Sequence, residues 1–191
     1  MTERQKNDTI KSRMMKLSDG KAKRREERKR MSQREEVRIR LKSVRYEVEA
    51  SLFSDEEDGL QITADELRVE PEMIEINSLG RFTQQEGRTE IAYEETEATG
   101  MEGATTAVSF MTEQPGVVSM IREGAVSTVL VFEAGQRHHC IYQTPFMPFE
   151  VCVHTLKVEN RLLDEGYLNL DYIVEIRGAK AERTKFRMEL L

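Results

Sequence analysis

From Glu36 to the C-terminus, hydrophobic and polar residues alternate with a period of two, which is typical of β-strands that bury one face. Turn-forming residues interrupt the alternation about every ten residues, as they do in β-sandwiches and β-barrels. The pattern predicts ten strands, at residues 36–49, 72–83, 88–97, 104–113, 117–123, 125–133, 136–143, 149–159, 166–177 and 181–190. Because a meander of hairpins leaves two exposed sheet edges unless it closes, we expect an all-β fold, a closed antiparallel meander β-barrel of about ten strands.

One face of these strands is almost entirely apolar, and we expect it to form the core. Its members are Ile91, Tyr93, Val108, Phe110, Val117, Ile121, Val126, Leu130, Phe132, Ile141, Phe149, Val151 and Val153. In the strand at 166–177 the even-numbered residues should also point inward. The opposite face, which includes Arg122 and Tyr142, is mostly polar and is expected to meet solvent. A register slip of one residue in any hairpin would exchange the two faces of a strand.

A barrel of ten strands leaves room for a ligand, since about eight already enclose one small molecule. Polar residues interrupt the inward face mainly at its two ends, which favours a partly apolar ligand with a polar or charged head. The predicted ligand-binding residues are Tyr93, Glu95, Ser119, Thr128, Arg137, His139 and Thr155. The alternative is that the terminal residues form a solvated rim, and that Ser119 and Thr128 bond each other across the strands.

Five short runs occur in a characteristic order along this part of the chain. They are Ile91-Ala-Tyr93-Glu94-Glu95, Arg122-Glu-Gly124, Phe132-Glu-Ala-Gly135, Tyr142-Gln-Thr144-Pro145 and Leu168-Asn-Leu170-Asp-Tyr172. Together they resemble the YwiB-like family of uncharacterised bacterial proteins, over about residues 35–191. The resemblance implies a calycin-like, or lipocalin-like, barrel and a class of small ligand; it implies no activity.

Charge divides the chain into two parts. Residues 1–31 hold twelve Lys and Arg against five Asp and Glu, whereas residues 32–191 hold seventeen against thirty. The first part has too few apolar residues to offset the entropy of ordering it, so we expect a disordered or partly helical basic N-terminal arm. The barrel domain would then span 32–191, with an acidic insertion at 54–71. Met31 is an alternative start of translation.

The basic arm supports a second functional hypothesis, an RNA- or protein-interaction module with the barrel as scaffold. Clustered positive charge binds nucleic-acid phosphates, but no aromatic residue is interleaved in the arm for base stacking. The chain has no long apolar run and only two cysteines, which predicts a cytoplasmic protein without a membrane span or export signal. An outward apolar stripe of Val118, Met120, Val129, Val131 and Leu156 must be covered by the acidic insertion or by a second subunit, and a homodimer is slightly favoured.

The turn expected at 144–148 would place His138 opposite His154 and Cys140 opposite Cys152 on the outer face. These residue types bind zinc, but side chains on one ladder point in parallel and successive ones lie about 7 Å apart, so no metal site is predicted. An oxidised cysteine pair is the alternative. No catalytic residues and no cofactor are predicted, because no nucleophile–base set or phosphate-binding glycine loop is evident. A binding protein is favoured over an enzyme, with hydrolysis or isomerisation inside the barrel as a third hypothesis.

Overall fold

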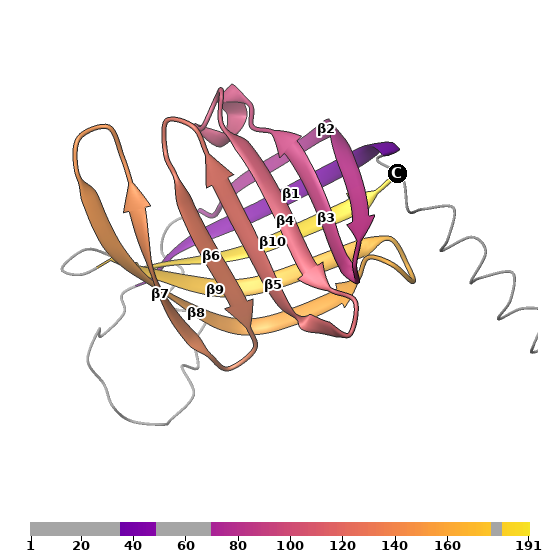
Figure 1. Cartoon of the computed structure of the whole chain (residues 1–191). Helices are drawn as coiled ribbons and strands as arrows, with labels where there is room; N and C mark the ends of the chain where they lie inside the picture. The colour runs from indigo at the N-terminus through magenta and orange to yellow at the C-terminus, as the bar shows by residue number, and fades with distance from the viewer. Residues whose placement is uncertain (1–34, 49–69, 177–180) are drawn as a thin grey trace, which may run out of the picture.

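A computed structural model of the 191-residue chain describes residues 35–48, 70–176 and 181–191 (Figure 1). The predicted basic arm and all but the end of the predicted acidic insertion lie outside these residues. The described part forms one antiparallel sheet of ten strands. They are β1 (Glu35–Val48), β2 (Glu72–Gln85), β3 (Arg88–Glu94), β4 (Thr105–Met111), β5 (Gln114–Glu123), β6 (Thr128–Glu133), β7 (Arg137–Gln143), β8 (Pro148–Arg161), β9 (Tyr167–Ile176) and β10 (Ala181–Leu190).

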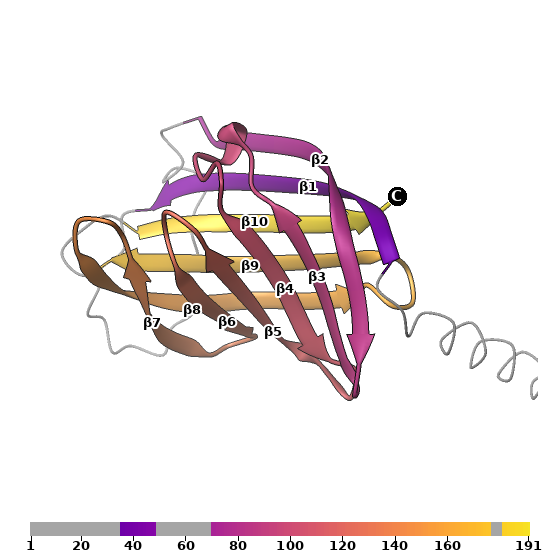
Figure 2. The same cartoon turned by 45° about the horizontal axis from the view of Figure 1, so that its top comes forward.

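The sheet curls into a nearly closed barrel, which confirms the predicted fold class (Figure 2). Its strand order is β6-β5-β4-β3-β2-β1-β10-β9-β8-β7, so the first and last strands of the chain pair with each other. The only helical turn in the described residues is the 3-10 helix η2 (Glu97–Thr99), between β3 and β4. None of the described helical structure is long and apolar enough to cross a membrane.

The strands β6 and β7 are the two edges of the sheet, although the sequence predicts a paired hairpin there. Within the described residues, the two strands are bridged at one position, where Ser127 and Gln143 exchange backbone hydrogen bonds of 3.0 and 2.9 Å. The turn between them is bonded to β8 instead: Gly135 N donates to Thr155 O, and Thr155 N donates to Gln136 O. The barrel is therefore closed by a seam of few hydrogen bonds rather than by a continuous ladder.

The core consists of apolar side chains on the inner face of the sheet. Phe82, Leu168 and Met188 are fully buried and lie toward the barrel end at which β2 passes to β3. Phe132 and Tyr172 pack against each other with ring centroids 4.7 Å apart. Side chains thus fill one half of the barrel, and less interior space remains than the strand number alone predicts.

The strand β5 faces the opposite way from its predicted orientation. Met111 pairs with Gln114, but the residue before it, Phe110, pairs with Val118, so the β4–β5 ladder contains a bulge. The bulge shifts the register by an odd number of residues and exchanges the two faces of β5. Val118 and Met120 are consequently buried in the core, and the predicted core residues Val117 and Ile121 are half-buried on the other face.

The strand β7 is also reversed. The β7–β8 turn spans four residues, 144–147, rather than the expected five, and Gln143 pairs with Pro148. The Thr144 hydroxyl organises this turn by donating to Met147 O at 2.7 Å and accepting from the backbone N–H groups of Phe146 and Met147. The predicted inward residues Arg137, His139 and Ile141 are therefore exposed, whereas Cys140 and Tyr142 pack against the core.

This register overturns the predicted cysteine and histidine pairs. Cys140 lies opposite Val151, and Cys152 lies opposite His139. The two cysteines are free, and burial raises the pKa of both thiols. Since a thiol must be deprotonated to bind zinc or to attack a disulfide, the environment of these cysteines opposes both reactions.

The predicted outward apolar stripe is likewise incomplete. Its members Val118 and Met120 belong to the core, which leaves Val129, 49% exposed, with the half-buried Val131 and Leu156 on the outer surface. The homodimer that was expected to cover the stripe stays a prediction.

Gly124 provides a test of the close approach between the end of β5 and the start of β4. Its φ is +150°, and an added Cβ would lie 2.7 Å from Ala104 Cα, which is backbone and cannot rotate away. Gly124→Ala should lower the free energy of unfolding by about 2 kcal/mol or more, as measured by urea denaturation. Gly116→Ala is the matched control, because nothing lies within 4 Å of its Cβ position. Equal stability of the two variants would contradict the described contact.

A second pair of variants tests the corrected faces of β5 and β7. Met120→Ala should destabilise the protein by about 2–4 kcal/mol because it removes a fully buried side chain. Ile141→Ala should cost less than about 0.5–1 kcal/mol, since Ile141 is 56% exposed. Chemical denaturation measures both values, and the reverse ranking would restore the faces that the sequence predicts.

Candidate ligand-binding site

One end of the barrel is hollow. Here the C-terminal ends of β1, β3, β5, β7 and β9 meet the N-terminal ends of the other strands, beside η2. The opening has a volume of about 370 Å³, which lies within the usual range for small-molecule sites. It adjoins an inner cavity of about 40 Å³, and both are lined by Arg45, Thr99, Met101, Arg122 and Tyr172.

Apolar side chains form one wall of the opening. Tyr142 and Phe149 stack with ring centroids 5.5 Å apart and an interplanar angle of 18°, which is a direct result of the four-residue turn that joins their strands. Further apolar lining comes from Leu130, Val151, Val174 and Ile176. This wall can bury the hydrocarbon part of a ligand.

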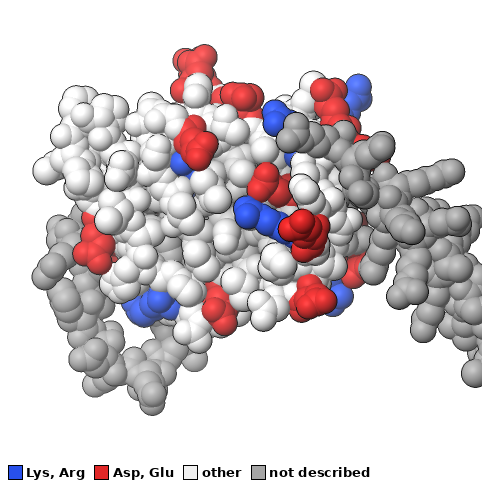
Figure 3. All heavy atoms as spheres, viewed as in Figure 1, with Lys and Arg blue, Asp and Glu red and all other residues white. Residues whose placement is uncertain are grey.

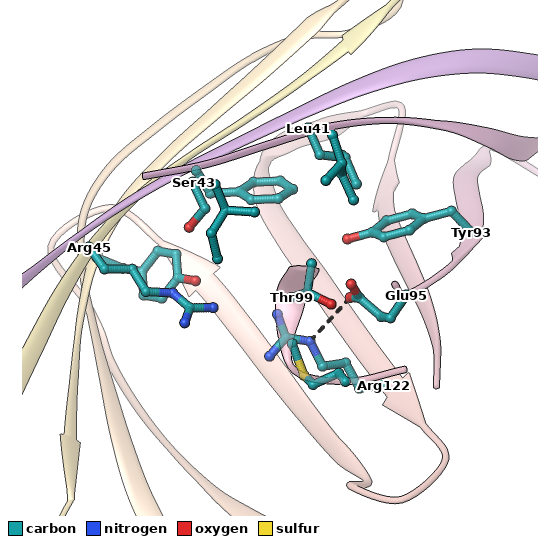
Figure 4. A pocket seen from close by; sticks show the side chains of 12 residues that line it. Leu41, Ser43, Arg45, Tyr93, Glu95, Thr99 and Arg122 are labelled. Atoms are coloured by element: carbon teal, nitrogen blue, oxygen red, sulfur yellow. Dashed lines mark ion pairs between the residues drawn. The ribbon is translucent and has the colours of Figure 1, made fainter. Parts of the chain in front are cut away.

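A polar group lies at the bottom of the hollow, on the inner cavity. Glu95 follows β3, and its backbone N–H donates to Ala104 O at 2.8 Å, which holds the carboxylate inward. The Thr106 hydroxyl donates to Glu95 Oε1. Figure 4 shows the Glu95 carboxylate beside the phenol of Tyr93 and facing Arg122 across the cavity. The Glu95 side chain is only 2% exposed, so its charge needs compensation from nearby groups.

Arg122 supplies that compensation incompletely. Its Nε lies 3.9 Å from Glu95 Oε1, which is an ion pair but too long for a hydrogen bond. Its Nη1 lies 3.5 Å from the Tyr142 hydroxyl, and its Nη2 lies 3.5 Å from Met120 Sδ. Nε has no hydrogen-bond partner in the described part of the chain, although the side chain is only 13% exposed. A buried guanidinium therefore retains donor capacity toward the hollow.

Arg45 on β1 is the second cation of the hollow and lies nearer its rim. Its Nη1 donates to Glu72 Oε2 at 3.3 Å, and its Nε lies 3.8 Å from Glu182 Oε1. Glu47 and Glu182 also line the opening. The rim thus carries charges of both signs, whereas the charged residues of the inner cavity are two arginines and one carboxylate, set among apolar side chains.

Burial raises the pKa of three tyrosines around the hollow, Tyr93, Tyr142 and Tyr172. The carboxylate of Glu95 raises the pKa of Tyr93 further, and Arg122 acts in the opposite direction. The three phenols are therefore neutral at physiological pH. In that form each can donate a hydrogen bond or accept one.

Two of the seven predicted ligand-binding residues, Tyr93 and Glu95, line the inner cavity. Thr128 and Thr155 are buried, as expected for inward residues, but line neither the cavity nor the opening. Ser119 lies on the other face of β5, opposite Ser109 and Val131. The positions of these residues do not test whether they bind a ligand, so that role stays a prediction.

Arg137 and His139, like Ser119, point away from the interior. Arg137 Nη1 donates to both carboxylate oxygens of Glu175 at 2.9 Å, and His139 Nδ1 lies 3.1 Å from Glu150 Oε1. Both side chains are engaged on the outer wall, on a strand whose register differs from the predicted one. The sequence pattern instead predicts Arg122 and Tyr142 on the outer face. It gives no indication of Arg45, because only the pairing of β1 with β10 brings Arg45 to this end of the barrel.

Metal ligation is not indicated here: no group of three or more His, Cys, Asp and Glu side chains in the described ranges is arranged to hold an ion.

Comparison with known proteins agrees with the fold. The model of a family described as a domain of unknown function, DUF1934, matches residues 59–188. The crystal structure of the ywiB protein from Bacillus subtilis is similar to this chain with a TM-score of 0.54 and 19% sequence identity. The similarity covers 83% of this chain and 95% of that one, and at this identity it shows the fold alone. No curated protein matches the chain.

The raised tyrosine pKa values predict a loss of stability at high pH. Above about pH 10 the tyrosines of the unfolded chain ionise, whereas the buried Tyr93 keeps its proton, so the unfolded state gains relative stability. The free energy of unfolding should therefore fall as pH rises past 10. Tyr93→Phe should reduce that slope by up to about 1.4 kcal/mol per pH unit, as measured by urea denaturation between pH 7 and 11.5. Parallel curves for wild type and variant would contradict the burial of this phenol.

Proposed function

The chain belongs to the DUF1934 family, a domain of unknown function, and we propose from its site that it binds a small, partly apolar molecule in the hollow end of the barrel. The observation that carries the proposal is the hollow itself, where an apolar wall and buried polar groups converge on one space. Such a combination is the usual character of small-molecule sites. The two free cysteines fit a reducing compartment, so the proposed place of binding is the cytoplasm.

The dimensions of the hollow limit the ligand. The core fills the far half of the barrel, so a ligand enters only the end near η2 and its apolar part lies along Tyr142, Phe149 and Ile176. Its polar end then reaches toward the inner cavity, which at about 40 Å³ has space for only a small group.

The alternative, an RNA- or protein-interaction module that uses the basic N-terminal arm, receives less support from the face of the barrel seen in Figure 3. Figure 3 shows the face formed by β3 to β6, on which Lys and Arg are scattered among uncharged and acidic residues rather than gathered into a patch. The basic arm on which that alternative depends lies outside the described residues. The hollow is therefore the better-supported site.

Binding can be tested with Nile red, an uncharged fluorophore whose emission increases in apolar surroundings. The wild type should increase its fluorescence with saturation at one site per chain. Ile176→Trp should weaken binding at least about ten-fold, because the indole fills the opening that Ile176 lines. Fluorescence titration measures both dissociation constants.

Ile141→Trp is the matched control, since it introduces the same ring on the outer surface at a residue that is 56% exposed. This variant should bind Nile red like the wild type. Equal weakening by both substitutions, or by neither, would show that the dye binds elsewhere and would overturn the proposed site. Native mass spectrometry of the purified protein adds a second readout, a co-purified small molecule lost in Ile176→Trp and kept in Ile141→Trp.

A further inference from the structure

The least satisfied polar group in the hollow is the guanidinium of Arg122. Resting on the proposed function, we infer that the ligand carries a monoanionic carboxylate, that this head group binds Arg122, and that its hydrocarbon part lies along the Tyr142–Phe149 wall. An arginine has five N–H donors in a planar fork that matches the two oxygens of a carboxylate. The contacts of Arg122 leave that fork largely unused.

Each protein contact of Arg122 is long or weak. The Tyr142 hydroxyl and Met120 Sδ both lie at 3.5 Å, at the limit of hydrogen bonding, and thioether sulfur is a weak acceptor. Glu95 is the nearest carboxylate, but its Oε1 lies 3.9 Å from Nε and already accepts the hydroxyl of Thr106. Glu95 thus balances the charge of Arg122 without accepting its N–H groups. Because the arginine is 13% exposed, bulk water has little access to them.

The charges that face the hollow favour no more than one negative charge on the ligand. The inner cavity is lined by Arg45, Arg122 and Glu95. Glu47 and Glu182 line the outer opening, and Glu72 contacts Arg45 from the rim. A monoanion at Arg122 would accept the N–H groups that Glu95 leaves unused. A dianion would add a second charge beside Glu95 and the rim carboxylates and would suffer stronger repulsion. The small inner cavity also favours a carboxylate over a bulkier tetrahedral head group.

The residues around the proposed head group indicate how the ligand is oriented, with its carboxylate inward and its hydrocarbon chain toward the opening. Figure 4 shows the Arg122 and Arg45 side chains entering the cavity from different strands, with a direct ion pair between Arg122 and Glu95. The phenols of Tyr93 and Tyr172 are neutral donors beside the same space. The wall toward β7 to β9 is apolar and lines the wider opening, and there the hydrocarbon chain would be buried.

The test is displacement of bound Nile red by octanoate, octanol and octylamine at pH 7.5, which share one hydrocarbon chain and differ in head-group charge. The wild type should bind octanoate at least about ten-fold more tightly than octanol, and octylamine most weakly. The double variant Arg122→Met/Glu95→Gln removes both buried charges together and so avoids an unpaired one. In it, octanoate affinity should fall to the level of octanol, with octanol affinity unchanged within about two-fold.

The double variant Arg183→Met/Asp171→Asn is the control, because it removes an ion pair of 2.8 Å from the outer face. It should keep the preference for octanoate. Nile red bound in the hollow together with equal affinities for octanoate and octanol in the wild type would overturn the carboxylate inference and leave the proposed site standing. The same holds if the preference survives in Arg122→Met/Glu95→Gln. Failure of the wild type to bind Nile red would overturn the proposed function and the inference with it.

Discussion

The pairing of β1 with β10 is the interaction on which the rest of the barrel depends. It joins the strands β1 to β6 to the strands β7 to β10, through an unbroken register from Ile39 and Leu190 to Val48 and Ala181. The other ladders join neighbours in the chain, and between β6 and β7 only one bridge is formed in the described residues. Without the β1–β10 ladder, Arg45 would not face the wall built by β7, β8 and β9, and no shared hollow would exist. The site is therefore a product of the longest-range contact in the fold, which must form against the greatest loss of chain entropy.

The hollow end also concentrates the features that cost stability. A carboxylate 2% exposed and a guanidinium 13% exposed lie 3.9 Å apart, so both are largely removed from water without a mutual hydrogen bond. Burying such a pair is rarely favourable compared with packed apolar residues. The opposite end, with Phe82, Leu168 and Met188, is packed mainly with apolar side chains. The barrel thus has one well-packed end and one end whose buried polar groups are incompletely hydrogen-bonded, a division that is consistent with the proposed binding role.

Alternation with a period of two was enough to predict all ten strands, because turn residues bound each apolar run. Tyr93 and Glu95 were placed inside correctly since Ile91 and Tyr93 alternate clearly with polar neighbours. The faces of β5 and β7 were not predictable in the same way. Between Val117 and Ile121 four of five residues are apolar, so either face of β5 could have been buried, and the bulge beside Met111 decides between them. In β7, one residue fewer in the turn at Thr144 reversed the whole strand.

These two local features have a joint consequence for the site. The bulge turns Arg122 into the barrel, and the short turn brings Tyr142 in to meet it, so that the guanidinium and the phenol lie 3.5 Å apart. If only β5 were reversed, Arg122 would be buried without the Tyr142 hydroxyl beside it. If only β7 were reversed, the Tyr142 hydroxyl would be buried without the Arg122 guanidinium. The two irregularities therefore meet in one contact, although they lie in different hairpins. An irregular turn and a bulge, rather than the regular strands, determine which chemistry the hollow contains.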